Sequence, residues 1–100
     1  MALTRKKISV VVACYNEEGN ILPMYERLSS VLSKLTTDFE IIYADNASAD
    51  GSEGVLRSLV AKDPRVSAIL FSRNFGSSQF GYTAGTARAK GDAIVWVDGD

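Results

Sequence analysis

Ile8-Ser9-Val10-Val11-Val12-Ala13-Cys14 is the segment that decides the fold class of this chain. It is short and rich in β-branched residues, and it is apolar with little alternation, which is typical of a β-strand covered on both faces. A helical pattern begins at Asn20. The spacing predicts one apolar helix face, formed by Ile21, Tyr25, Leu28, Leu32 and Leu35. A buried strand followed by an amphipathic helix is the first part of a βαβ unit.

The same alternation continues to the last residue. The pattern predicts further strands over 40–44, 66–71 and 93–97, and further helices over 52–62 and 78–90. We expect Asn20 to cap the first helix and Gly91 to cap the last one. Such alternation indicates an α/β fold of right-handed βαβ units, with a parallel sheet and helices on both faces.

Composition excludes several classes of function. The formal net charge of −1 leaves no basic footprint for nucleic acid. The chain contains no histidine, so oxygen ligands from carboxylates are the natural metal ligands here. Cys14 is the single cysteine, which excludes an internal disulfide. No apolar run approaches the roughly 18 residues that a membrane span requires, so we expect these residues alone to be soluble.

Polar clusters follow each expected strand, over 15–19, 45–52, 72–78 and 98–100. In open parallel sheets, ligands bind beyond the carboxyl ends of the strands. The four clusters therefore predict one site at that edge of the sheet.

Asp98-Gly99-Asp100 is the sharpest of these clusters. Two carboxylates at i and i+2 on an extended backbone point to the same side, about 6–7 Å apart, where they repel each other. Mg²⁺ or Mn²⁺, bound by one or two carboxylates and by a ligand's phosphates, would relieve that repulsion. The alternative is an ordinary turn, which Asp and Gly also favour.

Two other residues allow both a structural and a binding role. Asp45 could accept hydrogen bonds from a nucleobase or a ribose, or it could stabilise its own turn. Tyr15 could stack on a base or pack at the rim of the core. Asp50 fits a helix-capping role, and Arg73 fits a phosphate contact or a surface ion pair. Because glycine-rich phosphate loops are absent, a metal is the better holder for any phosphates.

These motifs together resemble a known family. The residues that carry the resemblance are Tyr15-Asn16-Glu17-Glu18, residues 40–51, Ser72-Arg73-Asn74-Phe75-Gly76, Ala84-Gly85, Lys90-Gly91-Asp92 and Asp98-Gly99-Asp100. They are similar to the family 2 glycosyltransferases, and most of all to polyprenyl-phosphate glycosyltransferases of the dolichol-phosphate mannose synthase type. The family usually has Pro where Ala13 stands, and Asp-Gly where Asn46-Ala47 stand.

The resemblance implies a GT-A, Rossmann-like fold and an inverting, metal-assisted enzyme. Its donor would be a UDP- or GDP-sugar, and its acceptor a polyprenyl phosphate such as undecaprenyl or dolichyl phosphate. By position, Ala13, Tyr15 and Glu17 would line the base pocket, and Asp45 would contact the base. Asp98 would bind the diphosphate and, together with Asp100, the Mg²⁺ or Mn²⁺ ion.

The resemblance also implies that residues 1–100 are only the N-terminal, nucleotide-sugar-binding part of a glycosyltransferase domain, truncated after the D-x-D motif. We expect the catalytic residues beyond Asp100, no transfer by these residues alone, and a full-length protein at the cytoplasmic face of a membrane. An uncovered fourth strand would favour association of copies into a homo-oligomer. The alternative is a non-catalytic nucleotide-binding or protein-interaction domain of doubly wound α/β type.

Overall fold

The computed structural model describes residues 2–99 and contains the expected alternation of strands and helices. The elements, in chain order, are β1 (Ile8–Cys14), α1 (Ile21–Leu35), β2 (Phe39–Asp45), α2 (Ser52–Lys62), β3 (Val66–Leu70), α3 (Ser78–Arg88) and β4 (Ala93–Asp98). The bounds of β1 and α2 are those predicted from the sequence, and the other bounds differ by one or two residues.

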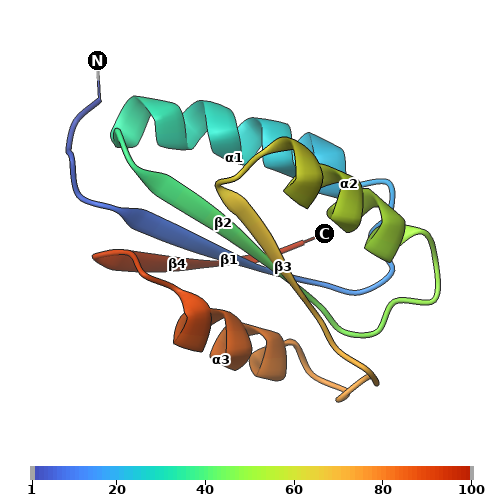
Figure 1. The fold of residues 1–100 in the computed structure, drawn as a ribbon. Coiled ribbons are helices and arrows are strands. Elements are labelled where there is room, and N and C mark those ends of the chain that lie inside the picture. The colour runs from blue at the N-terminus through green and yellow to red at the C-terminus, as the bar shows by residue number, and fades with distance from the viewer. Residues whose placement is uncertain (1, 100) are drawn as a thin grey trace.

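The four strands form one parallel sheet in the order β3-β2-β1-β4. The chain moves outward from β1 to β2 and β3, and then returns through α3 to place β4 on the other side of β1. Helices α1 and α2 cover one face of the sheet, and α3 covers the other (Figure 1). The predicted α/β class, with helices on both faces, is confirmed.

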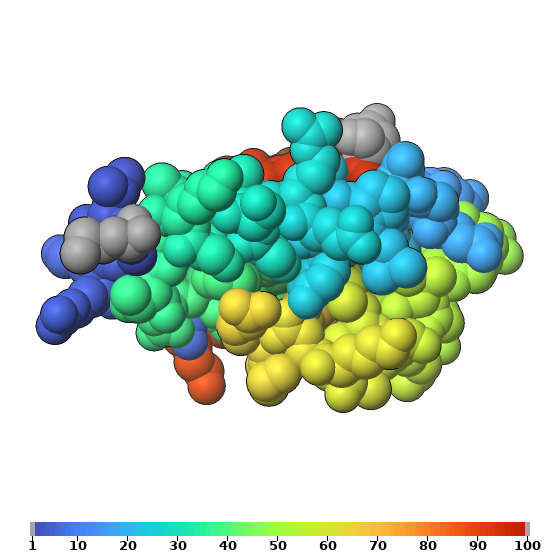
Figure 2. Space-filling view, turned by 90° about the horizontal axis from the view of Figure 1, so that it is seen from above, coloured from blue at the N-terminus to red at the C-terminus, as the bar shows by residue number. Residues whose placement is uncertain are grey.

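The main core lies between the sheet and the two-helix layer. It is built from alternate residues of β1 and β2, including Val10, Val12, Ile41 and Tyr43, packed against Ile21, Leu32, Leu56 and Leu59 of the helices. Figure 2 shows this face from outside, with α1 and α2 lying side by side over the sheet. These two central strands are buried on both faces, which explains why their sequences lack alternation.

On the opposite face, α3 approaches the sheet through glycine. A Cβ atom at Gly85 would overlap Cγ1 of Val11, and one at Gly81 would lie 3.2 Å from Cβ of Ala44. The absence of side chains at these two positions lets the helix backbone contact the sheet directly.

Strand β4 is the most exposed of the four. Trp96 is 59% exposed, although its ring stacks on Tyr82 of α3 with centroids 5.6 Å apart and its indole N–H donates to Thr86 Oγ1 at 2.9 Å. Ile94 and Val95 are also exposed. Among the described residues, β4 pairs with β1 alone.

Asn20 occupies the predicted N-cap position of α1, whereas the predicted Gly91 cap of α3 is wrong. The side chain of Asn20 makes no cap bond, because its amide donates to Glu17 Oε2 instead. Helix α3 ends at Arg88 with Ala89 as its extended C-cap residue, and Gly91 lies beyond it. The chain must turn early there, because the Lys90 N–H donates to Glu40 Oε2 and the Gly91 N–H donates to Ser9 Oγ.

The glycine contact leads to a stability prediction. Gly85→Ala should lower the free energy of unfolding by about 1–3 kcal/mol, because an added methyl in a packed contact costs more than the helix gains from alanine. Gly54→Ala is the matched control, since Gly54 lies in α2 with nothing within 4 Å of the added Cβ. That change should raise stability by about 0.5–1 kcal/mol. Urea unfolding followed by circular dichroism measures both, and equal effects would contradict the close approach.

Candidate functional site

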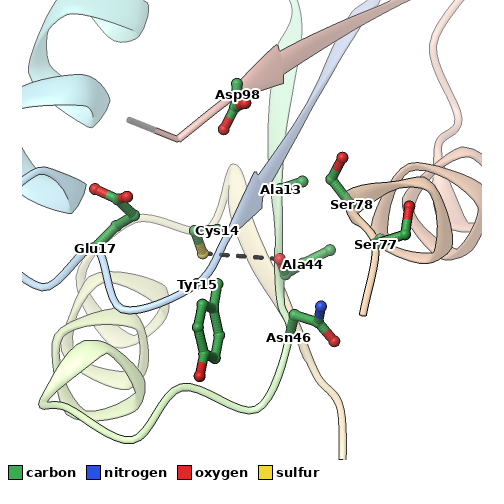
Figure 3. Close-up of a pocket in the computed structure, with 10 residues that line it drawn as sticks. Ala13, Cys14, Tyr15, Glu17, Ala44, Asn46, Ser77, Ser78 and Asp98 are labelled. Atoms are coloured by element: carbon green, nitrogen blue, oxygen red, sulfur yellow. Dashed lines mark hydrogen bonds between the residues drawn. The ribbon is translucent and has the colours of Figure 1, made fainter. Parts of the chain in front are cut away.

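A cavity of about 140 Å³ opens at the carboxyl edge of the sheet. It lies where β1 separates β2 from β4, which is the topological switch point of the fold. Figure 3 shows the side chains around the ends of these strands and the start of α3. The lining residues are Ala13, Cys14, Tyr15, Glu17, Ala44, Asn46, Ser77, Ser78, Gly81 and Asp98.

The floor of the cavity is made of small residues that stand in register. Ala13 pairs with Ala44 on one side and with Asp98 on the other. Residues in register on parallel strands project to the same face, so the Asp98 side chain shares the α3 face with the two alanines. A Cβ at Gly81 would lie within 3.5 Å of both alanine Cβ atoms. The space beside Asp98 therefore exists because its neighbours are small.

The turn after β4 also depends on glycine. The Gly99 N–H donates to the Ala13 carbonyl at 2.9 Å, and a Cβ at Gly99 would lie 2.9 Å from that oxygen. Gly99 therefore lets the D-x-D turn approach β1 and keeps Asp98 against the cavity. Asp100, the other expected metal ligand, lies outside the described residues.

The carboxylates at the cavity suit a hard divalent cation. Asp98 and Glu17 both line the cavity. Within residues 2–99 no group of three or more acidic, cysteine or histidine side chains is gathered for a metal. Mg²⁺ commonly takes only one or two protein carboxylates and completes its shell with water and phosphate oxygens. The donor set at Asp98 fits that pattern.

Asp45 lies on the other face of the sheet. It is only 3% exposed, is in register with Cys14, and does not line the cavity. Its carboxylate accepts hydrogen bonds from the backbone N–H and the hydroxyl of Ser48. The structure thus shows the turn-stabilising role for Asp45, and the base contact stays a prediction.

Cys14 is a buried thiol beside this carboxylate. Burial, together with the negative charge of Asp45, raises the pKa of the Cys14 thiol to about 12. A thiol with such a pKa is neutral at physiological pH and is a poor nucleophile. Cys14 therefore contributes packing to the cavity wall.

The loops after β1 and β2 are tied together by side chains. The Asn16 N–H donates to Ser48 Oγ and the Ala49 N–H donates to Asn16 Oδ1, both at 2.8 Å. Asp50 Oδ1 accepts from the N–H of Ser52, the first residue of α2, although the N-cap position itself belongs to Gly51. The loops hold Tyr15 at the rim of the cavity, 47% exposed, and Glu17 in its wall.

Sequence reasoning missed Asn46, Ser77, Ser78 and Gly81 as cavity residues. Asn46 could have been found, because alternation along β2 places it on the face opposite to Asp45. Ser77, which precedes α3, and Ser78 and Gly81 within it could not be singled out, because their position depends on how closely that helix approaches the sheet. Arg73 does not line the cavity, and its guanidinium lies over the Phe75 ring at 4.7 Å.

Comparison with known proteins assigns the chain to a family. Residues 9–100 match the family described as Glycosyl transferase family 2. The chain therefore belongs to glycosyltransferase family 2, and its four-stranded sheet is the GT-A arrangement.

Among its relatives is an uncharacterized glycosyltransferase, YkcC, of Bacillus subtilis, which is 44% identical over 92% of this chain. A prophage bactoprenol glucosyl transferase homolog of Escherichia coli is 35% identical over 94% of the chain. The chain spans 28% and 30% of the lengths of these two relatives.

A solved structure shows the same fold. The mannosyltransferase PcManGT from Pyrobaculum calidifontis, in complex with GDP-Man and Mn²⁺, superimposes with a TM-score of 0.76 over 96% of this chain and 28% of its own. The two sequences are 23% identical, so this likeness concerns the fold. Across residues 2–99, none of the helices has the length and apolar character needed to cross a bilayer.

The loop after β2 leads to a second stability prediction. Ala47 has φ of +58°, a left-handed conformation that a Cβ disfavours. Ala47→Gly should therefore raise the free energy of unfolding by about 0.5–1 kcal/mol. Ala49→Gly, two residues along the same loop but without positive φ, should lower it. Thermal unfolding compares the two variants, and a loss of stability in Ala47→Gly would contradict the loop conformation.

Proposed function

We propose that this chain binds the donor of an inverting glycosyltransferase that transfers a sugar from a UDP- or GDP-sugar to a polyprenyl phosphate. The observation that carries the proposal is the Asp98 carboxylate beside the small-residue cavity at the switch point. The relatives add support, because one is named for bactoprenol glucosyl transfer and a structural neighbour holds GDP-Man and Mn²⁺.

The cavity offers different chemistry at its two ends. At one end, Tyr15 provides an aromatic ring that suits a nucleobase. At the other end, Asp98 provides a carboxylate near the N-terminus of α3, where Ser77 and Ser78 lie. In the proposal Ala13, Tyr15, Glu17 and Asp45 serve the nucleoside, and Asp98 serves the diphosphate side.

Asp98 and Asp100 would hold Mg²⁺ or Mn²⁺. When bound, the ion stabilises the negative charge that the departing nucleoside diphosphate gains. Gly99 contributes by holding Asp98 close to β1, so that its carboxylate faces the cavity.

The acceptor requires orientation more than activation. A phosphate monoester has a second pKa of about 6 and is largely ionised near neutral pH, so a polyprenyl phosphate attacks without a general base. Because the chain spans less than a third of its relatives, transfer is proposed for the whole protein, at the cytoplasmic face of a membrane.

The metal role can be measured directly. UDP or GDP should bind the purified protein more tightly with Mn²⁺ than with EDTA, and Asp98→Asn or Asp100→Ala should lower the Mn²⁺-dependent affinity about tenfold or more. Asp38→Asn is the control, because Asp38 is an exposed carboxylate at the opposite edge of the sheet. Equal affinity with Mn²⁺ and EDTA in calorimetry would refute the metal role.

Asp45 needs a test that separates folding from binding. Asp45→Ala leaves the N–H and the hydroxyl of Ser48 without their partner, so it should lower the free energy of unfolding by about 1–3 kcal/mol. If Asp45 also contacts the base, the nucleotide affinity of the folded variant should fall by a similar amount. Calorimetry under conditions where the variant stays folded measures this affinity. An unchanged dissociation constant would mean that Asp45 only stabilises its turn.

A further inference from the structure

A pair of asparagine side chains joins the loops that follow β2 and β3. Asn46 Oδ1 accepts from the Phe75 N–H at 2.9 Å, and Asn46 Nδ2 donates to Asn74 Oδ1 at 3.3 Å. Asn74 Oδ1 also accepts from the Gly76 N–H at 2.6 Å. Two of these bonds join Asn46 to residues 28 and 29 positions later in the chain, and the third closes the turn between Asn74 and Gly76.

The linked segment leads directly into the cavity wall. Gly76 has φ of +82° and turns the chain toward Ser77, whose hydroxyl caps α3 by accepting from the Gln79 N–H. Ser77 and Ser78 then line the cavity together with Asn46. The position of the α3 N-terminus at the cavity therefore depends on how the preceding turn is held.

Aromatic packing also holds this segment. The Phe75 ring lies 5.3 Å from the rings of Phe71 and Phe80, measured between centroids. Residues 72–80 are exposed, so burial stabilises this segment little. The hydrogen bonds of the asparagine pair therefore matter more for its position.

We infer that Asn46 and Asn74 form a clamp that positions the start of α3 against the donor cavity, so that both are positioning residues for nucleotide-sugar binding. This inference rests on the proposed function. It assigns Asn74 a role although Asn74 does not line the cavity, because it acts through the turn that carries Ser77 and Ser78.

The two asparagines use different atoms of their amides, so an aspartate substitution should affect them differently. Asn74 acts only through its acceptor oxygen, which Asn74→Asp retains and Asn74→Ala removes. Asn46 uses both its oxygen and its amide nitrogen, so Asn46→Asp keeps the bond from Phe75 but loses the donor to Asn74.

The test is calorimetric titration of the purified chain with UDP and GDP in the presence of Mn²⁺. Asn74→Ala should weaken binding about three- to tenfold, the equivalent of one neutral hydrogen bond, and Asn74→Asp should restore it. In a double-mutant cycle, Asn46→Ala and Asn74→Ala should be clearly non-additive. Thr83→Ala, which removes an exposed hydroxyl bond within α3, should leave the affinity unchanged.

Hydrogen exchange of the nucleotide-free protein adds a second readout. Asn74→Ala should speed exchange of the Gly76 amide while amides in β1 keep their protection. If the unaltered chain binds nucleotide and Asn74→Ala binds it equally well, the clamp has no positioning role and the inference fails. If the unaltered chain binds neither nucleotide, the proposed function fails and the role of the clamp in donor binding fails with it, whatever the exchange rates show.

Discussion

The contact between α3 and the sheet is the constraint on which the candidate site depends. Gly81 and Gly85 bring the helix backbone onto Val11, Ala13 and Ala44, where an added Cβ would overlap Val11 at Gly85 and would be tightly packed at Gly81. The same contact sets the distance from the α3 N-terminus to the end of β4. Because Ala13 and Ala44 are also small, that distance leaves a cavity beside Asp98 where a continuous core would otherwise form. Close packing and an open site are thus consequences of the same small residues.

The alternation of side chains along the strands divides the polar residues between two environments. Asp45 and Cys14 stand in register on the side of α1 and α2, where burial raises the pKa of the thiol and Ser48 satisfies the carboxylate. Asp98 stands in register with Ala13 on the side of α3, where it meets the cavity. A shift of β4 by one residue against β1 would move the Asp98 side chain to the opposite face of the sheet. The register between β1 and β4 therefore determines whether the Asp98 carboxylate meets the cavity.

The sequence predicted the architecture well because the fold follows from local patterns. Buried runs, helical periodicity and turn residues at the strand ends were sufficient for the seven elements and for the edge that carries the site. Local patterns could not decide features that arise from contacts between distant segments. Glycine is a common cap residue, but the backbone N–H groups of Lys90 and Gly91 donate to Glu40 and Ser9 instead, so the helix ends before Gly91. Ser77 and Ser78 reach the cavity only through the packing of α3 and the turn before it.

The strands on the two sides of the site differ in burial. β1 and β2 are buried on both faces and carry Ala13, Ala44 and the loops that hold Tyr15 and Glu17. β4 is exposed along most of its length and is held by its pairing with β1 and by the stack of Trp96 on Tyr82. Segments with little burial open more readily than the core does. A ligand that bridges Asp98 and the β1 loop would bind only the closed arrangement, and its binding free energy would stabilise β4 against opening. Under the proposed function, donor binding would therefore favour the order of β4, because the Asp98 carboxylate belongs to the least buried strand.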